Sequence, residues 1–270
     1  MERFEPMLAK KYVPKLTTFP AVMQPKFNGY RCIVTKDDCW TRLGNDHKPG
    51  LVNGLFHGIQ EQIPEHWALD GEIYCHGVPL QDIISLGKNW RDESSCLYYV
   101  VYDMYSEVEP KLPLCQRLKR VDELVFNIKD HRLHDSPHNL ALKSSEVDYA
   151  LQHWAEAGYE GVIIRQPQSP YHFGRHGRDL QKFKKWDDAE WVITDITEGQ
   201  GKAEGTPVFH CQSITGKPFK VCMNGDYRYL HKLWRNRNHI KGKLITIRYN
   251  ELSKDKCPKD GRGIAIRDYE

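Results

Sequence analysis

The sequence predicts an α+β domain over residues 1–187, followed by a small β-barrel domain over residues 188–270. Its 270 residues, 40% of them apolar and 28% charged, suffice for two modest hydrophobic cores. Before Trp186, short strand-like runs are interrupted by helices without the regular alternation of a βαβ series. After Trp186, about five strands and one helix follow within about eighty residues, which is typical of a barrel of OB type. Residues 185–188 are therefore the expected hinge.

Strands are expected in the first domain wherever a short run rich in Val, Ile or Tyr is bounded by Gly, Pro, Asn or Asp. Because neighbouring side chains along a strand point to opposite faces, such runs can bury one face of a sheet. The runs are Ala21–Gln24, Tyr30–Thr35, Trp67–Cys75, Cys96–Tyr102, Gly161–Arg165 and Asp179–Lys184.

Two amphipathic helices are expected between these strands, because apolar residues recur there at steps of three and four. We expect Ser145 to cap the second helix and Gly158 to end it. The apolar stripes are Leu114, Leu118, Val121 and Val125 in the first helix, and Val147, Ala150, Leu151, Trp154 and Ala155 in the second.

The second domain shows the same strand pattern, with one helix expected from an Asp226 cap toward Asn238. The expected strands are Trp191–Thr197, Thr206–Ser213, Pro218–Met223, Leu244–Glu251 and Gly263–Arg267.

Composition excludes several classes of protein. No apolar run approaches the roughly 20 residues of a membrane span, and residues 1–15 contain no apolar segment of a secretory signal. The eight cysteines form no C-x-x-C pair, so we expect free thiols in an intracellular protein. The net charge of +3 is uneven, −1 over residues 1–187 and +4 over residues 188–270, and the basic part could attract a polyanion.

The most informative motif is Lys26-Phe27-Asn28-Gly29-Tyr30-Arg31, between two expected strands. Gly29 would let the backbone turn closely against a ligand, while Lys26 and Arg31 converge on a phosphate. A lysine amine near a second cation loses basicity and becomes a usable nucleophile. Taken alone, the motif is too short to distinguish this site from a surface turn carrying two ordinary charges, which would be the simpler interpretation.

Five further patterns follow in order along the chain. Each has a structural interpretation of its own: a turn, a core aromatic or an exposed strand edge. The patterns are Thr41-Arg42-Leu43-Gly44, Asp70-Gly71-Glu72, Tyr99-Val100-Val101-Tyr102-Asp103, Glu160-Gly161-Val162-Ile163-Ile164-Arg165 and Lys182-Phe183-Lys184.

The order and spacing of all six patterns resemble the covalent nucleotidyltransferases, most closely the minimal, viral or phage-type ATP-dependent DNA ligases. The resemblance covers nearly the whole chain, from the opening Pro6-Met7-Leu8-Ala9 to a tail, residues 257–268, that looks like motif VI. It implies a nucleotidyltransferase (adenylation) domain of antiparallel sheets and flanking helices, then an OB domain. It also implies that nicks in duplex DNA are sealed through a lysyl-AMP intermediate and an adenylylated DNA 5′ end.

The resemblance also implies a role for each matching residue. Lys26 matches the lysine that becomes adenylylated, and Arg31 its partner arginine. Glu72 matches a glutamate near the AMP ribose, Tyr102 the aromatic residue that stacks on adenine, and Glu160 an acid that helps to place the metal. The lysines that contact the α-phosphate are matched by Lys182 and Lys184.

Three further assignments come from the same resemblance. Arg42 matches the arginine that holds the phosphate at the nick. Arg267, with Arg262 as second choice, matches the OB-domain arginine that orients the pyrophosphate. Gln24 could meet the adenine amino group. Two positions depart from the usual pattern: Asn28 stands where Asp is usual, and Thr41 where Ser is usual.

The implied cofactors are ATP and a divalent metal ion, Mg²⁺ or Mn²⁺. Glu160 and Glu72 are the implied ligands of the metal ion. The implied partner is nicked duplex DNA, clamped by a monomer whose second domain would swing between ATP and the duplex.

Three other interpretations remain open at this stage. A GTP-dependent RNA capping enzyme shares the lysine motif and an OB domain, and an RNA ligase shares the chemistry. A module that binds nicks or single strands without catalysis is the alternative of another class. Covalent labelling by ATP would separate an enzyme from such a module.

Overall fold

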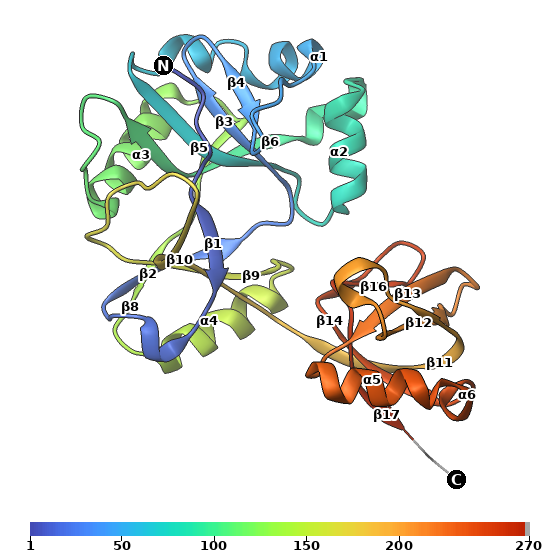
Figure 1. Ribbon diagram of the computed structural model, residues 1–270. Coiled ribbons are helices and arrows are strands. Elements are labelled where there is room, and N and C mark those ends of the chain that lie inside the picture. The colour runs from blue at the N-terminus through green and yellow to red at the C-terminus, as the bar shows by residue number, and fades with distance from the viewer. Residues whose placement is uncertain (268–270) are drawn as a thin grey trace. The chain divides into compact units, whose positions relative to one another are not determined.

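The protein forms two compact units, Met1–Lys184 and Lys185–Glu270 (Figure 1). The computed structural model describes residues 1–267, with the side chains of Arg175 and His176 left out. The division between the units falls slightly before the boundary expected after Asp187.

The first unit contains two mixed five-stranded sheets, and most of the site residues expected from the sequence lie on their strands. In the first sheet β1 pairs with β10 in parallel, and the other neighbours are antiparallel. Its order is β1 (Leu8–Lys11), β10 (Arg175–Lys184), β9 (Gly161–Arg165), β2 (Ala21–Lys26) and β8 (Asn139–Ala141).

The second sheet is antiparallel except where β7 joins β6. Its order is β4 (Cys39–Thr41), β3 (Tyr30–Thr35), β5 (Trp67–Tyr74), β6 (Tyr98–Ser106) and β7 (Leu133–Asp135). The helices of this part are α1 (Pro49–Leu51), α2 (Leu80–Lys88) and α3 (Leu114–Ile128), with short helical turns at Pro14–Leu16, Val52–Phe56, Gln60–Gln62 and Asp92–Cys96.

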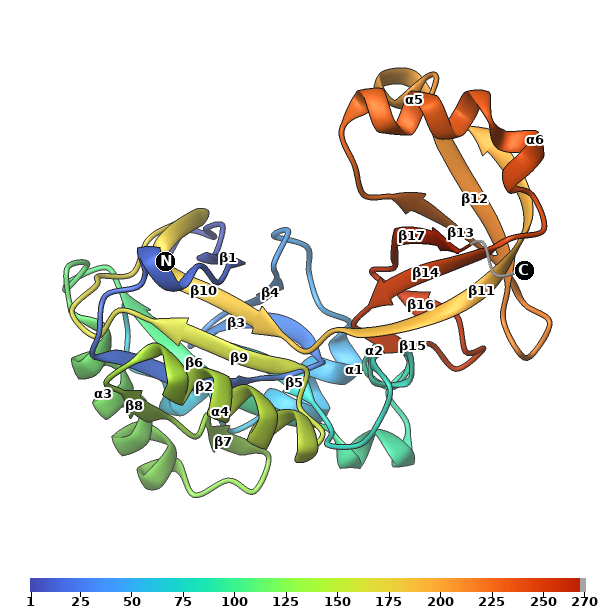
Figure 2. The ribbon, with the colours of Figure 1, turned by 90° about the horizontal axis from the view of Figure 1, so that it is seen from below.

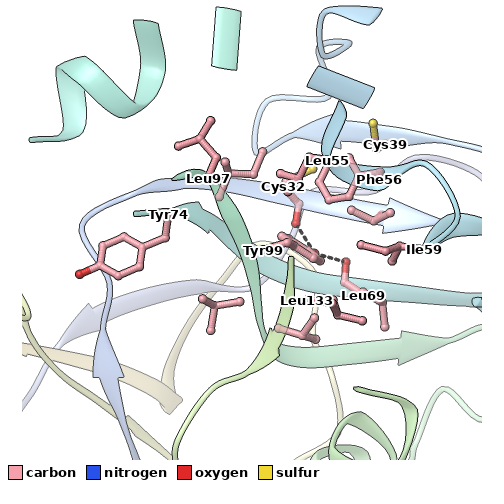
Figure 3. Close-up of a cluster of buried hydrophobic side chains, with 14 of the residues drawn as sticks. Cys32, Cys39, Leu55, Phe56, Ile59, Leu69, Tyr74, Leu97, Tyr99 and Leu133 are labelled. Atoms are coloured by element: carbon pink, nitrogen blue, oxygen red, sulfur yellow. Dashed lines mark hydrogen bonds between the residues drawn. The ribbon is translucent and has the colours of Figure 1, made fainter. Parts of the chain in front are cut away.

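The core of the second sheet is built around Tyr99, which is fully buried on β6 (Figure 3). Its hydroxyl donates to the carbonyl oxygens of Cys32 at 2.8 Å and Leu69 at 3.1 Å, so the buried hydroxyl has hydrogen-bond partners within the protein. Phe56 packs edge-on against it with ring centroids 5.2 Å apart. This packing fixes the three central strands that carry candidate site residues.

The face of the first sheet formed by β2 and β9 is covered by α4 (Ser144–Glu156) (Figure 2). The apolar stripe is confirmed, since Val147 and Trp154 are buried in this core. The cap assignment is wrong: Lys143 is the N-cap residue and makes no side-chain cap hydrogen bond, so Ser145 lies within the first turn. Gly158, with φ of +87°, follows the helix as expected.

The second unit is a closed five-stranded barrel in the order β11–β12–β13–β17–β14. In chain order the five strands thus pair 1-2-3-5-4 and back to 1, and a helix crosses between the third and fourth, which is the OB arrangement. The strands are β11 (Asp187–Glu198), β12 (Pro207–Gln212), β13 (Pro218–Met223), β14 (Leu244–Tyr249) and β17 (Arg262–Arg267), with a side hairpin of β15 (Glu251–Leu252) and β16 (Pro258–Lys259).

The helix of the barrel unit, α5 (Tyr227–Arg235), begins at Asp226 as expected, because the Asp226 carboxylate accepts from the Tyr229 N–H at 2.8 Å. A short α6 (Arg237–Ile240) follows, and a helical turn covers Gly201–Ala203. All eight cysteines are free, and within residues 1–267 none of the helices is both long and apolar enough to cross a bilayer.

Candidate active site

The two sheets of the first unit meet at a cavity of about 620 Å³. One wall comes from β1, β2, β9 and β10, and the other from β3, β5, β6 and the turn after β4. This volume lies within the range of pockets that enclose small ligands. Of the residues singled out in the sequence, those lining it are Gln24, Lys26, Arg31, Arg42, Glu72, Tyr102 and Lys182.

The turn from β2 to β3 carries Lys26 and Arg31 into opposite walls of this cavity. Only glycine is tolerated at Gly29, since a Cβ there would lie 2.2 Å from the Ile73 carbonyl oxygen. Phe27 is buried and packs edge-on against Tyr159, with ring centroids 5.4 Å apart. The sequence folds this way because one buried aromatic ring and one close backbone approach fix both ends of the turn.

Lys26 forms an ion pair with Glu160, whose other carboxylate oxygen is 2.5 Å from the Lys184 ammonium nitrogen. The Glu160 N–H also donates to the Lys26 carbonyl at 2.9 Å. Lys26, Gly161 and Lys184 are partners across three adjacent strands. Glu160 and Lys184 thus join the site through Lys26.

Burial disfavours ionisation of Glu160, but the charges of Lys26 and Lys184 outweigh it and hold the pKa of the carboxyl below its usual value. Glu160 is therefore a carboxylate between two ammonium groups. An ammonium held in this way has no lone pair to attack with, so Lys26 must lose this partner and a proton before it can act as a nucleophile.

Glu72 lies near this triad and titrates differently. Its carboxylate accepts from the Gly29 N–H at 3.2 Å. Burial raises the pKa of Glu72 to about 7, with the charge of Glu160 adding to the shift and Lys26 and Arg31 opposing it. The two neighbouring carboxyl groups thus differ: the pKa of Glu72 is raised, whereas the pKa of Glu160 is lowered.

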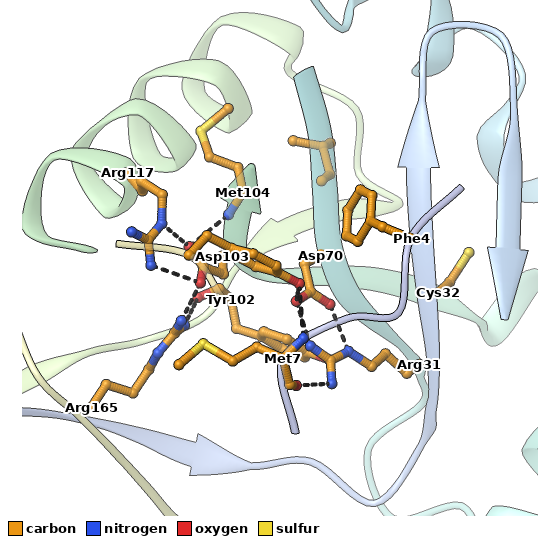
Figure 4. Close-up of polar contacts among 12 residues, drawn as sticks. Phe4, Met7, Arg31, Cys32, Asp70, Tyr102, Asp103, Met104, Arg117 and Arg165 are labelled. Carbon is orange, nitrogen blue, oxygen red and sulfur yellow. Dashed lines mark hydrogen bonds and ion pairs between the residues drawn. The ribbon is translucent and has the colours of Figure 1, made fainter. Parts of the chain in front are cut away.

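Arg31 is held rigidly on the opposite wall (Figure 4). Its guanidinium donates to both carboxylate oxygens of Asp70, at 2.7 and 2.5 Å, and to the Met7 carbonyl at 2.6 Å. The Tyr171 hydroxyl in turn donates to Asp70 at 2.6 Å. Arg31 also lies over the Tyr102 ring, with 5.6 Å from its Cζ to the ring centroid.

A buried network lies beneath Tyr102 (Figure 4). Asp103 is fully buried and pairs with both Arg117 and Arg165. Arg165 and the Gln24 amide nitrogen both donate to the Tyr102 carbonyl, at 2.9 and 3.0 Å. The Gln24 side chain is therefore tied to the backbone under the expected base-stacking residue.

The Arg165 Nε has no hydrogen-bond partner among the described residues, although it is buried and its side chain lines the cavity. Such an orphaned donor indicates room for a polar ligand.

Several residues of this site carried no signal of their own in the sequence. Arg165 ends one of the motifs but reads there as the end of a strand. Tyr171 and the Met7 carbonyl act on Arg31 from distant parts of the chain, and a backbone carbonyl leaves no residue-type pattern. Asp70 is visible as a carboxylate beside Glu72, but its arginine partner is not.

The remaining candidates lie at the edge of the cavity or in the barrel unit. Arg42 is exposed in the turn after β4, at the rim of the lining. Arg267 and Arg262 lie on β17 of the barrel unit. The Arg267 Nε donates to the Thr246 hydroxyl at 2.8 Å, and Arg262 is exposed.

The residues of the cavity suit a nucleoside triphosphate with a hard cation. Five of the lining residues are cationic, and three of them could face phosphates: Lys26, Arg31 and Lys182. Among the described residues no cluster of three or more His, Cys, Asp or Glu could hold a metal alone. The carboxyl groups of Glu72 and Glu160 suit an ion that takes most of its oxygens from phosphate and water.

The fold and the lysine-centred cavity define a covalent nucleotidyltransferase. The family model described as the ATP dependent DNA ligase domain matches residues 6–184. The DNA ligase of African swine fever virus (strain Badajoz 1971 Vero-adapted) is 30% identical, across 97% of this chain and 68% of the relative. The DNA ligase of Methanosphaera stadtmanae is 28% identical, across 67% of this chain and 35% of the relative.

Solved structures share the fold. A structure from a study of Lig E DNA ligases superposes with a TM-score of 0.76 at 18% identity, covering 97% of this chain and 98% of that one. The Chlorella virus DNA ligase-adenylate gives a TM-score of 0.58 at 23% identity, covering 99% of both chains. The chain belongs to the ATP-dependent DNA ligase family, whose function is nick sealing through an adenylate intermediate.

Proposed function

We propose that the protein seals nicks in duplex DNA as a monomer and that Lys26 is the residue that carries AMP. The ion-paired arrangement of Lys26, Glu160 and Lys184 at the wall of the cavity is the observation that carries this proposal. A binding module needs no lysine held between two strands with a carboxylate partner at its amine.

In the first step the Lys26 amine attacks the α-phosphorus of ATP. A P–N bond forms, the P–O bond to the β-phosphate breaks, and pyrophosphate leaves with the electron pair of that bond. Glu160 is the nearest base for the proton of Lys26. Once Glu160 no longer holds Lys184, the ammonium groups of Lys184 and Lys182 can offset the charge that builds on the α-phosphate.

The nucleotide contacts follow from the two walls. Tyr102 offers a ring for adenine, with Gln24 beneath it, and Glu72 is placed to meet the ribose once it is bound. Arg31, fixed by Asp70 and the Met7 carbonyl, keeps its remaining N–H groups for phosphate. A divalent ion is proposed as well: Glu160 and Glu72 would hold Mg²⁺ or Mn²⁺, which would supply Lewis acidity at phosphate oxygens.

The later steps use DNA. The 5′-phosphate at the nick takes AMP from Lys26, and the 3′-hydroxyl then displaces AMP and closes the strand. We assign Arg42 to the nick phosphate and Arg267 to the pyrophosphate of ATP.

Labelling with α-³²P-ATP and Mg²⁺ tests the proposal. The wild-type protein is expected to take up label in an acid-labile bond and to seal a nicked duplex with ATP, but not with GTP or NAD⁺, as sole nucleotide. Lys26→Ala is expected to lose both label and sealing. Label retained by Lys26→Ala would disprove the assignment, and labelling by GTP instead of ATP would favour a capping activity.

A further inference from the structure

The charge of the second unit is sharply segregated along the chain. Residues 187–204 contain six Asp or Glu and one Lys, whereas residues 227–250 contain seven Lys or Arg and no acidic residue. The basic segment covers α5, α6 and β14. A uniform solvated surface would mix the two signs.

Three cations of this segment form a stripe on α5. Arg228, Lys232 and Arg235 are spaced i, i+4 and i+7, which places them on one side of the helix. All three are exposed. Leu230 and Leu233 pack on the barrel core, so the helix is anchored and the stripe faces away from that contact.

The stripe differs from the other cations of the segment in having no partner among the described residues. Arg237 stacks over Trp234 at 4.2 Å, Lys241 pairs with Asp195 at 2.9 Å, and Arg248 pairs with Asp188 at 2.9 Å. In contrast, the side chains of Arg228, Lys232 and Arg235 make no hydrogen bond or ion pair with any residue in the described range 1–267.

We propose that Arg228, Lys232 and Arg235 form a contact surface for the phosphate backbone of duplex DNA. Seven residues of helix span about 10 Å, and one DNA strand presents about three phosphates over that length. Three unpartnered cations on a capped, anchored helix thus match three phosphates in number and spacing. The inference rests on the proposed function, because it assumes that duplex DNA is the substrate.

Two alternatives, membrane binding by this helix and nucleic-acid binding by strand β11, are less consistent with the structure. A helix that lies on a membrane must offer its apolar side to lipid, but Leu230 and Leu233 are packed on the barrel. OB barrels also bind nucleic acid on their strands, but β11, the longest strand of this barrel, carries five acidic residues and no Lys or Arg. The basic helix is therefore a better site for a polyanion than β11.

The test measures binding of the full-length protein to a nicked duplex over a series of salt concentrations. The triple variant Arg228→Gln, Lys232→Gln, Arg235→Gln should lower the slope of log K against log salt by about 2.7, that is, about 0.9 for each lost contact. At about 0.1 M salt this amounts to a loss of affinity on the order of 10²-fold. The double variant Arg228→Lys, Arg235→Lys keeps the charges and should bind like the wild type.

The matched control is Lys111→Gln, Lys129→Gln, Lys143→Gln, which removes the same charge from exposed sites on the first unit. An unchanged slope in the α5 variant, or an equal loss in this control, would overturn the proposal. The proposal would also be overturned if the α5 variant changed the binding of anionic lipid vesicles but left the binding of nicked DNA unchanged. If the triple variant does not fold, each single variant should lower the slope by about 0.9, and unchanged slopes in all three would overturn it.

Labelling of the same proteins by α-³²P-ATP separates this inference from the proposed function. The α5 variant should label at the wild-type rate, because the stripe is not part of the cavity. A wild-type protein that never labels refutes the catalytic proposal, while the salt slope still decides the role of α5.

Discussion

At the scale of single residues, Glu160 brings two lysines, from the strands on either side of β9, to one carboxylate. This requires β9 to approach β10 closely, and Gly161 makes the approach possible. A Cβ at Gly161 would lie 2.2 Å from the Phe183 carbonyl oxygen, and its φ of +155° also favours glycine. The pairing of Glu and Gly in this motif thus has a steric reason beside a chemical one.

Tyr171 is expected to position Arg31 without touching the substrate. In Tyr171→Phe, one carboxylate oxygen of Asp70 loses its hydroxyl donor at 2.6 Å in a buried site. We expect the free energy of unfolding to fall by about 1–3 kcal/mol and the KM for ATP in self-labelling to rise. Urea denaturation and labelling at varied ATP concentration measure the two effects.

The matched control is Tyr105→Phe, which belongs to the same aromatic group. Its hydroxyl makes no hydrogen bond with a described residue, so little change is expected in either measurement. An equal KM effect in both variants would contradict a role for the Tyr171 hydroxyl.

Glu72 should give the protein a pH-dependent stability. Burial raises its pKa to about 7, above the value of about 4.5 expected in the unfolded chain. Between these values the folded state binds the extra proton, so stability falls as pH rises toward and through 7. The difference in Tm between Glu72→Gln and the wild type should therefore shift in favour of the variant from pH 5 to pH 8, measured by thermal denaturation.

Glu61→Gln, at an exposed glutamate, provides the control and should show no such shift. A Tm difference for Glu72→Gln that is constant across this pH range would show that Glu72 does not titrate there.

At the scale of elements, the segment before β1 holds Arg31 in place at the wall of the cavity. Phe4 packs against Trp40, with ring centroids 5.5 Å apart, and against Phe173, with centroids 4.7 Å apart. The same segment supplies the Met7 carbonyl to Arg31, and Leu8 lines the cavity. A short stretch of chain thus links aromatic packing to the position of a phosphate-binding arginine.

Phe4→Ala is expected to lower the free energy of unfolding by about 2–3 kcal/mol, because the ring is half-buried among other aromatics. It should also weaken self-labelling at low ATP concentration, since the Met7 carbonyl loses its support. Phe126→Ala, whose ring is 74% exposed, should change stability by no more than about 0.5 kcal/mol. Comparable losses in the two variants, in urea denaturation and in labelling, would contradict the role of the segment.

The sequence predicted most strands but not every element, for reasons that lie in packing. Runs rich in Val, Ile or Tyr set β3 and β9 at their observed bounds. In contrast, α2 was not predicted. Gly87 in its last turn is a poor helix former, but a glycine is needed there because a Cβ would lie 1.8 Å from the Tyr30 hydroxyl oxygen. Ser145 was a plausible cap by type, but the backbone enters the helix two residues earlier.

For the site, the motif order pointed to the lysines and carboxylates, and the structure brings Lys26, Glu160 and Lys184 together. The contacts that hold Arg31 could not be predicted, because Tyr171 and Asp70 meet across a long sequence separation.

At the scale of the whole molecule, chemistry and charge are divided between the units. The first unit holds the cavity and is nearly neutral, with 23 Lys and Arg against 24 Asp and Glu. The second holds the excess positive charge, with 16 against 12. Attraction of a polyanion therefore falls mainly to the barrel unit, and covalent chemistry to the other.

This division predicts that two arginines affect different steps. Arg267, on the barrel, is assigned to ATP, so Arg267→Ala should slow formation of the Lys26 adenylate by about 10²-fold and spare closure of a nick that is already adenylylated. Arg42, at the cavity of the first unit, is assigned to the nick phosphate. Arg42→Ala should therefore leave self-labelling nearly intact and slow closure of the pre-adenylylated nick by a similar factor.

Single-turnover assays with α-³²P-ATP and with a synthetic adenylylated nick measure the two steps separately. Arg248→Ala is the control on the barrel, because Arg248 is engaged with Asp188 and has no assigned step. Equal losses of both steps in Arg42→Ala would contradict its assignment to the nick. A normal rate of self-labelling in Arg267→Ala, with a loss in Arg262→Ala, would move the pyrophosphate role to the other arginine of β17, because both residues stand on the same strand.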